Sequence, residues 1–283
     1  MERARYTRVD CFNAPWMNFT SVCAIACALL FSVQVRAHEY WFEPETFFPA
    51  AGERTAVHLH VGDGLIKDRQ ERPFQAAHTP LFRGITPSGN LDLRPAQAEG
   101  ALPVHVLATG QAGGYLLAME RDWFFISLDA RKFEAYLRDE GLEHVIAERA
   151  ARGETDMAGR ERYSRFIKSL LQVGEHRDHT YEKQAGMRLE ITPLENPYAK
   201  KIGEDLLFQV MFDGKPLAGQ AVYADNRGSA TQTRVTDRDG RVTMHIERAG
   251  LWLLRLVHMR RCTADCGAAD WESFWGAFTF GAR

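Results

Sequence analysis

The chain contains 283 residues, of which 45% are hydrophobic, and its 35 Lys and Arg nearly balance its 37 Asp and Glu, leaving a formal net charge of −2. A near-neutral chain without a basic cluster does not have the composition of a nucleic-acid-binding protein, so no nucleic-acid partner is expected. The residues that follow position 37 are enough for one large domain or two small ones.

Residues 1–37 have the pattern of an export signal. Basic residues near the start precede an apolar run at 22–33, which is too short to cross a bilayer comfortably. The small side chains of Val35 and Ala37 suit a signal peptidase, so we predict cleavage before His38 and export to the periplasm. No later segment is long and apolar enough to be a transmembrane helix.

A mature chain that begins at His38 carries two metal-binding nitrogens on one residue. The α-amine has a pKa of about 8 and the imidazole a pKa of about 6.5, so a metal ion displaces protons from both. Together the amine and Nδ1 close a chelate ring on Cu(II), Ni(II) or Co(II). The alternative is that His38 is merely the residue where cleavage falls. Met17 is an alternative start of the chain.

Residues 38–128 are predicted to form an N-terminal β-sandwich. Short strands with alternating or apolar patterns are separated by Gly-rich and Pro-rich turns, which is typical of this architecture. The expected strands are 40–43, 55–61, 81–85, 104–108, 115–119 and 123–128.

Two histidines lie on one face of the expected strand at 55–61. His58 and His60 alternate with apolar residues that face the other way. Residues i and i+2 of a strand are about 6 to 7 Å apart, so the two imidazoles could share one metal ion. The alternative is two solvated histidines on the polar face of a half-buried strand.

Residues 129–175 are predicted to form a helical insert. Asp129 suits the N-cap of a first helix that ends at Gly141, and a second helix is expected over 142–152. A third helix is expected because five apolar residues recur at the spacing i, i+3, i+4, i+7, i+8. These residues are Tyr163, Phe166, Ile167, Leu170 and Leu171.

A linker is expected over residues 176–186. It begins with His176, Asp178 and His179, whose side chains are potential metal ligands. Such clusters also arise in loops by chance, so the run is a weak candidate site.

Residues 187–283 are predicted to form a second β-sandwich, with strands separated by turns such as the one at 237–240. Within the strand at 251–258, alternation places His258 on the same face as Trp252. His258 ends this strand. A lone histidine on an apolar face is usually a core residue, but here the strand end meets loops, which leaves a ligand role open.

Two cysteines, Cys262 and Cys266, remain after the predicted cleavage. In an oxidising compartment such a pair closes a small disulfide loop, which we expect here. A metal-thiolate pair is the alternative.

A series of short motifs resembles the DUF4198 family of exported bacterial proteins. The motifs are HEYWFEP at 38–44, FEAYL with EGL at 133–142, RYSR with a lysine at 162–168, GKPLAG at 214–219, TDRDGR at 236–241, and DWES with a tryptophan at 270–275. The resemblance runs from His38 to nearly the end of the chain. It implies an association with nickel or cobalt uptake systems.

The latter half of the chain is also similar to the prealbumin-like, carboxypeptidase-regulatory type of β-sandwich. Modules of this type bind or connect other components and rarely catalyse. Within the family pattern, His38 and His258 match recurrent positions, whereas His58 and His60 do not obviously match any.

The expected protein is therefore mainly β, with two β-sandwich domains and a helical insert between them. Its expected function is to hold nickel, cobalt or copper through His38 and His258, with Glu272 and Asp270 as optional oxygen ligands, for delivery to a membrane metal-uptake transporter. Two alternatives are a metal-free scaffold module of the envelope and a copper oxidase with an N-terminal histidine brace. We do not expect this protein to be an enzyme. In particular, no hydrolase is supported, since neither Gly-x-Ser-x-Gly nor His-Glu-x-x-His occurs.

Overall fold

The computed structural model describes residues 38–65 and 67–283, and these residues belong to one compact unit. The predicted signal peptide at 1–37 lies outside the described residues. The strands are β1 (Glu39–Pro44), β2 (Arg54–Asp63), β3 (Lys67–Glu71), β4 (Leu81–Thr86), β5 (Gly89–Asp92), β6 (His105–Ala108), β7 (Gly113–Leu128), β8 (Gly159–Val173), β9 (Leu189–Pro193), β10 (Glu204–Phe212), β11 (Lys215–Pro216), β12 (Ala221–Asn226), β13 (Gln232–Val235), β14 (Arg241–Ile246), β15 (Gly250–Arg261) and β16 (Trp271–Ala282). The helices are α1 (Ala130–Asp139), α2 (Glu143–Ala151) and four short 3₁₀ turns at 76–78, 94–96, 180–182 and 197–199.

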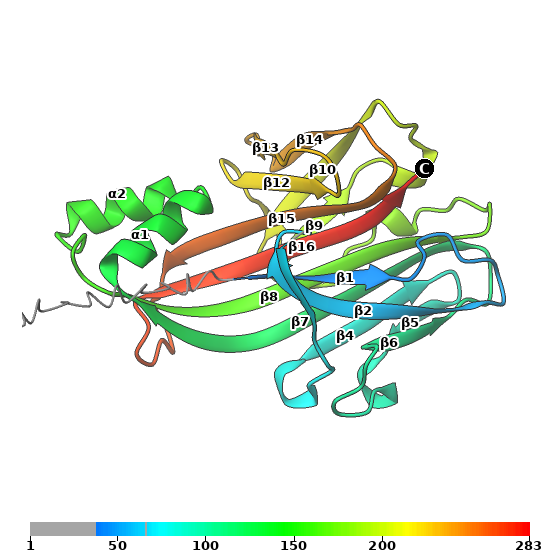
Figure 1. Cartoon of the computed structure of the whole chain (residues 1–283), viewed down its shortest axis with the longest axis horizontal. Helices are drawn as coiled ribbons and strands as arrows, with labels where there is room; N and C mark the ends of the chain where they lie inside the picture. Colours follow the sequence, from blue (N-terminus) through cyan, green and yellow to red (C-terminus); the bar gives the residue numbers. More distant parts are fainter. Residues whose placement is uncertain (1–37, 66) are drawn as a thin grey trace, which may run out of the picture. The chain divides into compact units, whose positions relative to one another are not determined.

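An eight-stranded central sheet contains strands from both halves of the chain (Figure 1). Its strand order is β13-β12-β15-β16-β8-β7-β4-β5. Its neighbouring strands are antiparallel except for β8 and β16, which are parallel. Two four-stranded sheets pack on it: sheet N contains β1, β2, β3 and β6, and sheet C contains β9, β10, β11 and β14. The prediction of a mainly β fold with sandwich packing is thus confirmed, and the two sandwiches share one sheet.

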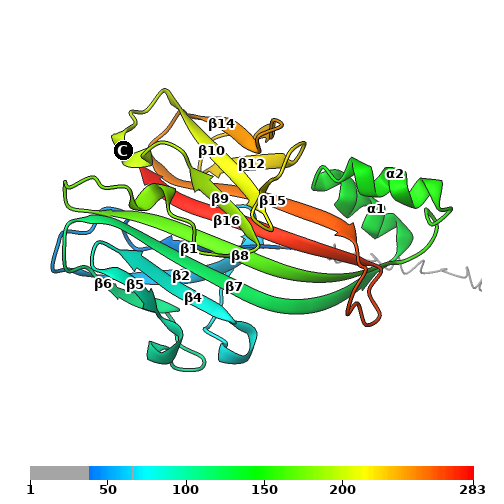
Figure 2. The same ribbon diagram turned by 180° about the vertical axis from the view of Figure 1, so that it is seen from behind.

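The two faces of the central sheet carry different layers. The face that we call face C packs against sheet C through residues such as Phe166, Leu254 and Phe278. The opposite face, face N, packs against sheet N through residues such as Ile167 and Leu171. One end of face N is covered by α1 and α2, which lie beside the ends of the long strands (Figure 2).

The third predicted helix is wrong, because Gly159–Val173 forms strand β8. β8 is paired with β7 on one side and β16 on the other, and both of its faces are buried. A strand buried on both faces is apolar at successive positions, so its pattern also satisfies a helical spacing. The first two helices are confirmed, and Asp129 caps α1 by accepting a hydrogen bond from the Lys132 amide at 3.0 Å.

A buried ion pair joins β8 to sheet C. Lys168 and Glu190 are 1% and 4% exposed, and Nζ lies 2.9 Å from the Glu190 carboxylate and 3.1 Å from Thr192 Oγ1. Glu190 also accepts hydrogen bonds from the amides of residues 185–187. A buried charge without a partner lowers the stability of the fold by several kcal/mol, so Lys168 and Glu190 must stay together. Because Glu190 also binds the amides at the end of the expected linker, the ion pair holds this segment against β8.

The expected disulfide between Cys262 and Cys266 is present in the loop between β15 and β16, with a Cα–Cα distance of 5.8 Å. Within residues 38–65 and 67–283, no helix has the length and apolar character needed to cross a membrane.

The start of β8 gives a test of how α1 docks. A Cβ atom at Gly159 would overlap the ring of Phe133, a fully buried residue of α1. We therefore expect Gly159→Ala to lower the free energy of unfolding by about 1 to 3 kcal/mol, measured by denaturant unfolding. Gly110→Ala is the matched control, because the space around Gly110 is open. Equal stability of the two variants would contradict this packing.

Candidate functional site

The two histidines expected to share a metal ion lie on opposite faces of the central sheet. His258 projects from face C, where its ring centroid is 4.6 Å from that of Phe212. His38 directly precedes β1 on face N, and its carbonyl oxygen accepts a hydrogen bond from Arg165 of β8 at 3.3 Å. The sheet separates the two imidazoles, so the structure does not bring His38 and His258 together.

His258 is half-buried among aromatic side chains. Its Nδ1 atom is 3.4 Å from the side-chain oxygen of Gln220, and its ring is tilted against Phe212 and stacked on Phe274. Burial lowers the pKa of His258 to about 4, with a further contribution from the charge of His144. The prediction that His258 and Trp252 lie on the same face of their strand is correct. The sheet topology does not support the prediction that His258 and His38 bind the same metal ion.

The two acidic residues expected as oxygen ligands are already ion-paired. Asp270 accepts two hydrogen bonds from Arg160, at 2.8 and 2.7 Å, and these lower the pKa of its carboxyl group. Glu272 lies between Arg162 at 2.5 Å and Arg260 at 2.6 Å. Burial alone would raise the pKa of Glu272, but the two arginines lower it. Both carboxylates therefore hold strand ends together.

His58 and His60 share a face of β2, as predicted, with ring centroids 5.9 Å apart. His58 Nδ1 is 2.7 Å from a carboxylate oxygen of Glu71. His60 is only 5% exposed and lies against Trp41, with its Nε2 atom 3.8 Å from Glu43. Burial lowers the pKa of His60. The pair thus belongs to a local polar cluster of sheet N.

The linker cluster has a structural role at Asp178. Its carboxylate accepts hydrogen bonds from the amides of Gly114 and Thr180, at 3.0 and 2.9 Å. His179 is exposed and pairs with Glu182 at 3.2 Å. Across the described ranges 38–65 and 67–283, no three His, Cys, Asp or Glu side chains are grouped so that they could hold a metal ion.

The polar groups that stand out lie around the start of β1 on face N. We call them the β1 site, which consists of His38 and two flanks. The acidic flank contains Glu39, Glu140, Asp225 and Arg255, and the basic flank contains Tyr40, Arg121 and Arg165.

The acidic flank places three carboxylates around one guanidinium group. Arg255 of β15 lies 2.9 Å from Glu39 of β1, 2.8 Å from Asp225 of β12 and 3.6 Å from Glu140 at the end of α1. The three acidic residues are 6%, 9% and 7% exposed, respectively. The flank therefore carries an excess of buried negative charge.

This excess perturbs one carboxyl group strongly. Burial raises the pKa of Glu140 to about 8, and the charge of Glu39 raises it further while Arg255 opposes the rise. The Oε2 atom of Glu140 has no hydrogen-bond partner. This raised pKa favours the protonated form of Glu140 at neutral pH.

The basic flank contains two buried arginines that form no ion pair with a carboxylate among residues 38–65 and 67–283. Arg121 and Arg165 are 2% and 7% exposed, and their guanidinium carbons lie 5.2 and 4.2 Å from the centroid of the Tyr40 ring. Arg121 donates one hydrogen bond to Gln75 at 2.6 Å. Burial lowers the pKa of Arg121, and the like charge of Arg165 adds to this.

Glu161 lies behind the basic flank on the same strand as Arg165. It accepts hydrogen bonds from Tyr136, at 3.2 Å, and from Ser273. Burial raises the pKa of Glu161 to about 7, although these hydrogen bonds oppose the rise. Its second oxygen, Oε2, has no hydrogen-bond partner.

Several buried polar atoms at or close to the β1 site have no hydrogen-bond partner among the described residues: His38 Nδ1, Arg121 Nε and Nη1, Arg165 Nε, Glu140 Oε2 and Glu161 Oε2. Others lie elsewhere, among them both ring nitrogens of His60 and Nε of Arg149. Each buried polar atom without a partner costs about 1 to 3 kcal/mol. Such atoms are rare in native structures and call for an explanation, of which an absent ligand is one.

The sequence pointed to His38 but not to the two flanks of the β1 site, because the flank residues come from six elements spread over most of the chain. One signal was available: Arg255 interrupts the otherwise apolar run at 251–257. A charged residue within a strand buried on both faces needs a partner in the fold.

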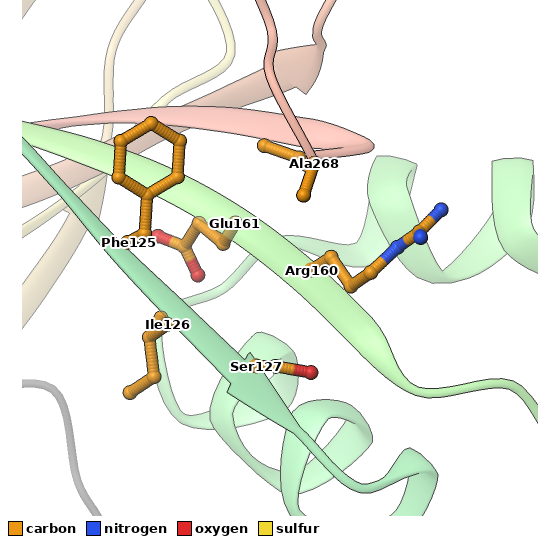
Figure 3. A pocket seen from close by; sticks show the side chains of 7 residues that line it. Phe125, Ile126, Ser127, Arg160, Glu161 and Ala268 are labelled. Atoms are coloured by element: carbon orange, nitrogen blue, oxygen red, sulfur yellow. The ribbon is translucent and has the colours of Figure 1, made fainter.

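A hollow lies at the end of β7 and the start of β8, beneath the loop that carries Ala268, and Glu161 is among its lining residues (Figure 3). Its volume is about 180 Å³, and its walls include Phe125, which is 61% exposed, and Arg160, whose guanidinium group points away from it. Sites for small organic ligands usually measure about 300 to 1,000 Å³. The hollow is too small and too poor in convergent polar groups to compete with the β1 site.

Comparisons with known proteins give a family but no activity. A family model described as "Domain of unknown function (DUF4198)" matches residues 35–260. No curated protein matches the chain. Among solved structures, the three N-terminal domains of the Highly Immunogenic Outer Capsid protein (Hoc) of bacteriophage RB49 are similar at 9% identity and a TM-score of 0.19, with 86% of this chain and 59% of that chain covered.

The raised pKa of Glu140 predicts a pH-dependent stability. The folded state keeps a proton that the unfolded state loses above its ordinary pKa of 4.5, so this stability is lost as pH rises toward about 8. Glutamine stays neutral, so we expect Glu140→Gln to raise the melting temperature relative to wild type more at pH 8.5 than at pH 5.

Glu134→Gln is the control for this experiment, because Glu134 lies on the same helix and pairs with Arg138 near the surface. Melting curves of the three proteins at both pH values supply the comparison. If the gain from Glu140→Gln were the same at pH 5 and pH 8.5, the buried acidic flank would not have the predicted protonation.

Proposed function

Because this chain belongs to the DUF4198 family, for which no activity is assigned, we propose its function from the β1 site: it is an exported protein that binds a divalent transition metal through its mature N-terminal His38. The amine and Nδ1 of His38 form the chelate. The acidic flank, rather than His258, balances the charge of the ion.

The observation that carries this proposal is the position of His38. Its Nδ1 atom is enclosed and has no hydrogen-bond partner, and its neighbour Glu39 belongs to a cluster with more carboxylates than cations. A bound cation would offset the negative charge that Glu39 and Asp225 together carry beyond the single positive charge of Arg255. Signal cleavage before His38 is part of the proposal, since it frees the amine.

The metal is nickel, cobalt or copper, which accept nitrogen ligands of this kind. Copper binds most tightly in vitro whatever ion the cell supplies, because affinity follows the Irving–Williams order. The resemblance to exported proteins associated with nickel or cobalt uptake supports a role in passing the ion to a membrane uptake transporter. We propose binding and delivery in the periplasm, not catalysis.

A copper oxidase with a histidine brace is less well supported. A brace needs a second histidine beside the N-terminal one, and the expected partner, His258, projects from the other face of the central sheet.

The test compares two purified proteins that differ only at the N-terminus. One begins at His38, and the other carries one additional alanine before it, which converts the amine to an amide. We expect the first to bind one equivalent of Ni(II), Co(II) or Cu(II) in isothermal titration calorimetry, and the second to bind at least about 10-fold more weakly because it has lost a donor.

Two substitutions distinguish the role of His38 in metal binding from that of His258. His38→Ala should abolish tight binding, whereas His258→Ala should retain it. Equal affinity of both N-terminal forms, or loss of binding in His258→Ala alone, would contradict the proposal. If no form binds a metal, the metal-free interaction module becomes the better explanation.

A further inference from the structure

The basic flank presents a problem that a metal ion cannot solve. Arg121 and Arg165 are both almost fully buried and both face the ring of Tyr40. Among the residues that the structure describes, neither guanidinium group is hydrogen-bonded to a carboxylate, and their only side-chain or carbonyl acceptors are Gln75 and the His38 carbonyl. Two like charges are therefore held together with little compensation.

The unpartnered atoms of the basic flank are all hydrogen-bond donors. Nε and Nη1 of Arg121 and Nε of Arg165 are buried donors without acceptors. Arg149, which is also 2% exposed, donates hydrogen bonds to the backbone carbonyl oxygens of Glu154 and Met157, although its Nε has no partner. The half-buried Arg162 binds Glu272 and two backbone carbonyl oxygens. A flank that offers several N–H donors and net positive charge suits an acceptor-rich anion.

We propose that the basic flank is a binding site for a small oxyanion, that is, inorganic phosphate or the carboxylate of a small organic acid. Planar guanidinium groups match the geometry of both, and each unpartnered N–H group would gain a charge-assisted hydrogen bond. The Tyr40 ring holds the two arginines in place through cation–π contacts. The inference is independent of metal binding, because it rests on different residues and on the opposite charge.

Glu161 is an acidic residue on the same strand as Arg165, and the charge of Arg165 lowers its pKa. Glu161 accepts hydrogen bonds from Tyr136 and Ser273. It does not satisfy the N–H groups of Arg121 and Arg165 that have no acceptor among the described residues.

The experiment uses metal-free mature protein that begins at His38, in a chloride buffer without phosphate or carboxylates. Phosphate, acetate and citrate are titrated separately, and binding is followed by calorimetry and by the melting temperature. We expect saturable binding of at least one of these anions and a rise in melting temperature of roughly 5 °C at 100 times Kd. The arm that saturates identifies phosphate or carboxylate as the source.

The variants Arg121→Gln and Arg165→Gln should lose this rise without losing stability in anion-free buffer, because each removes an uncompensated buried charge. Arg162→Gln is the matched control: it should lower the melting temperature in every buffer, because it breaks the pair with Glu272, yet keep the anion-dependent rise. Saturable binding that survives Arg121→Gln and Arg165→Gln would overturn the proposal. So would an equal, non-saturating rise in all variants, which is the signature of general salt exclusion.

Discussion

The parallel pairing of β8 with β16 is the constraint on which the rest of the structure depends. It places residues 161–169 beside residues 271–279, although the two segments are far apart in the sequence. Because β7 pairs with the other edge of β8 and β15 with the other edge of β16, the two halves of the chain share one central sheet. Sheet N and sheet C can then only pack on opposite faces of it.

This arrangement explains why the charged residues of the long strands gather in one place. Arg121, Arg165 and Arg255 project from β7, β8 and β15 on face N, where β1 and the end of α1 cover them. Burying charge is costly unless it is paired, and only Arg255 finds carboxylates. The buried charges thus form an acidic flank and a basic flank beside His38. The acidic flank suits a cation, and the basic flank suits an anion.

Much of the fold could be predicted from local patterns. Alternation identified β2 and β15, capping chemistry identified α1, and the spacing and expected compartment of Cys262 and Cys266 indicated their disulfide. The failure at β8 has a physical cause, since burial on both faces removes the period that distinguishes a strand from a helix. The prediction that His38 and His258 share one site was wrong for another reason. Alternation fixes the side of a strand on which His258 lies, but only the sheet topology determines that His38 lies on the other face.

The account's central claim is that processing creates a metal chelate at the start of β1. The most direct test is native intact-mass spectrometry of the protein purified from the periplasm, without chelators and without an N-terminal tag. The account predicts a chain that begins at His38 and carries one transition-metal ion, which is released when the protein is denatured. A chain cleaved at any other position, or one that begins at His38 but carries no metal when the medium is rich in nickel, cobalt and copper, would contradict it.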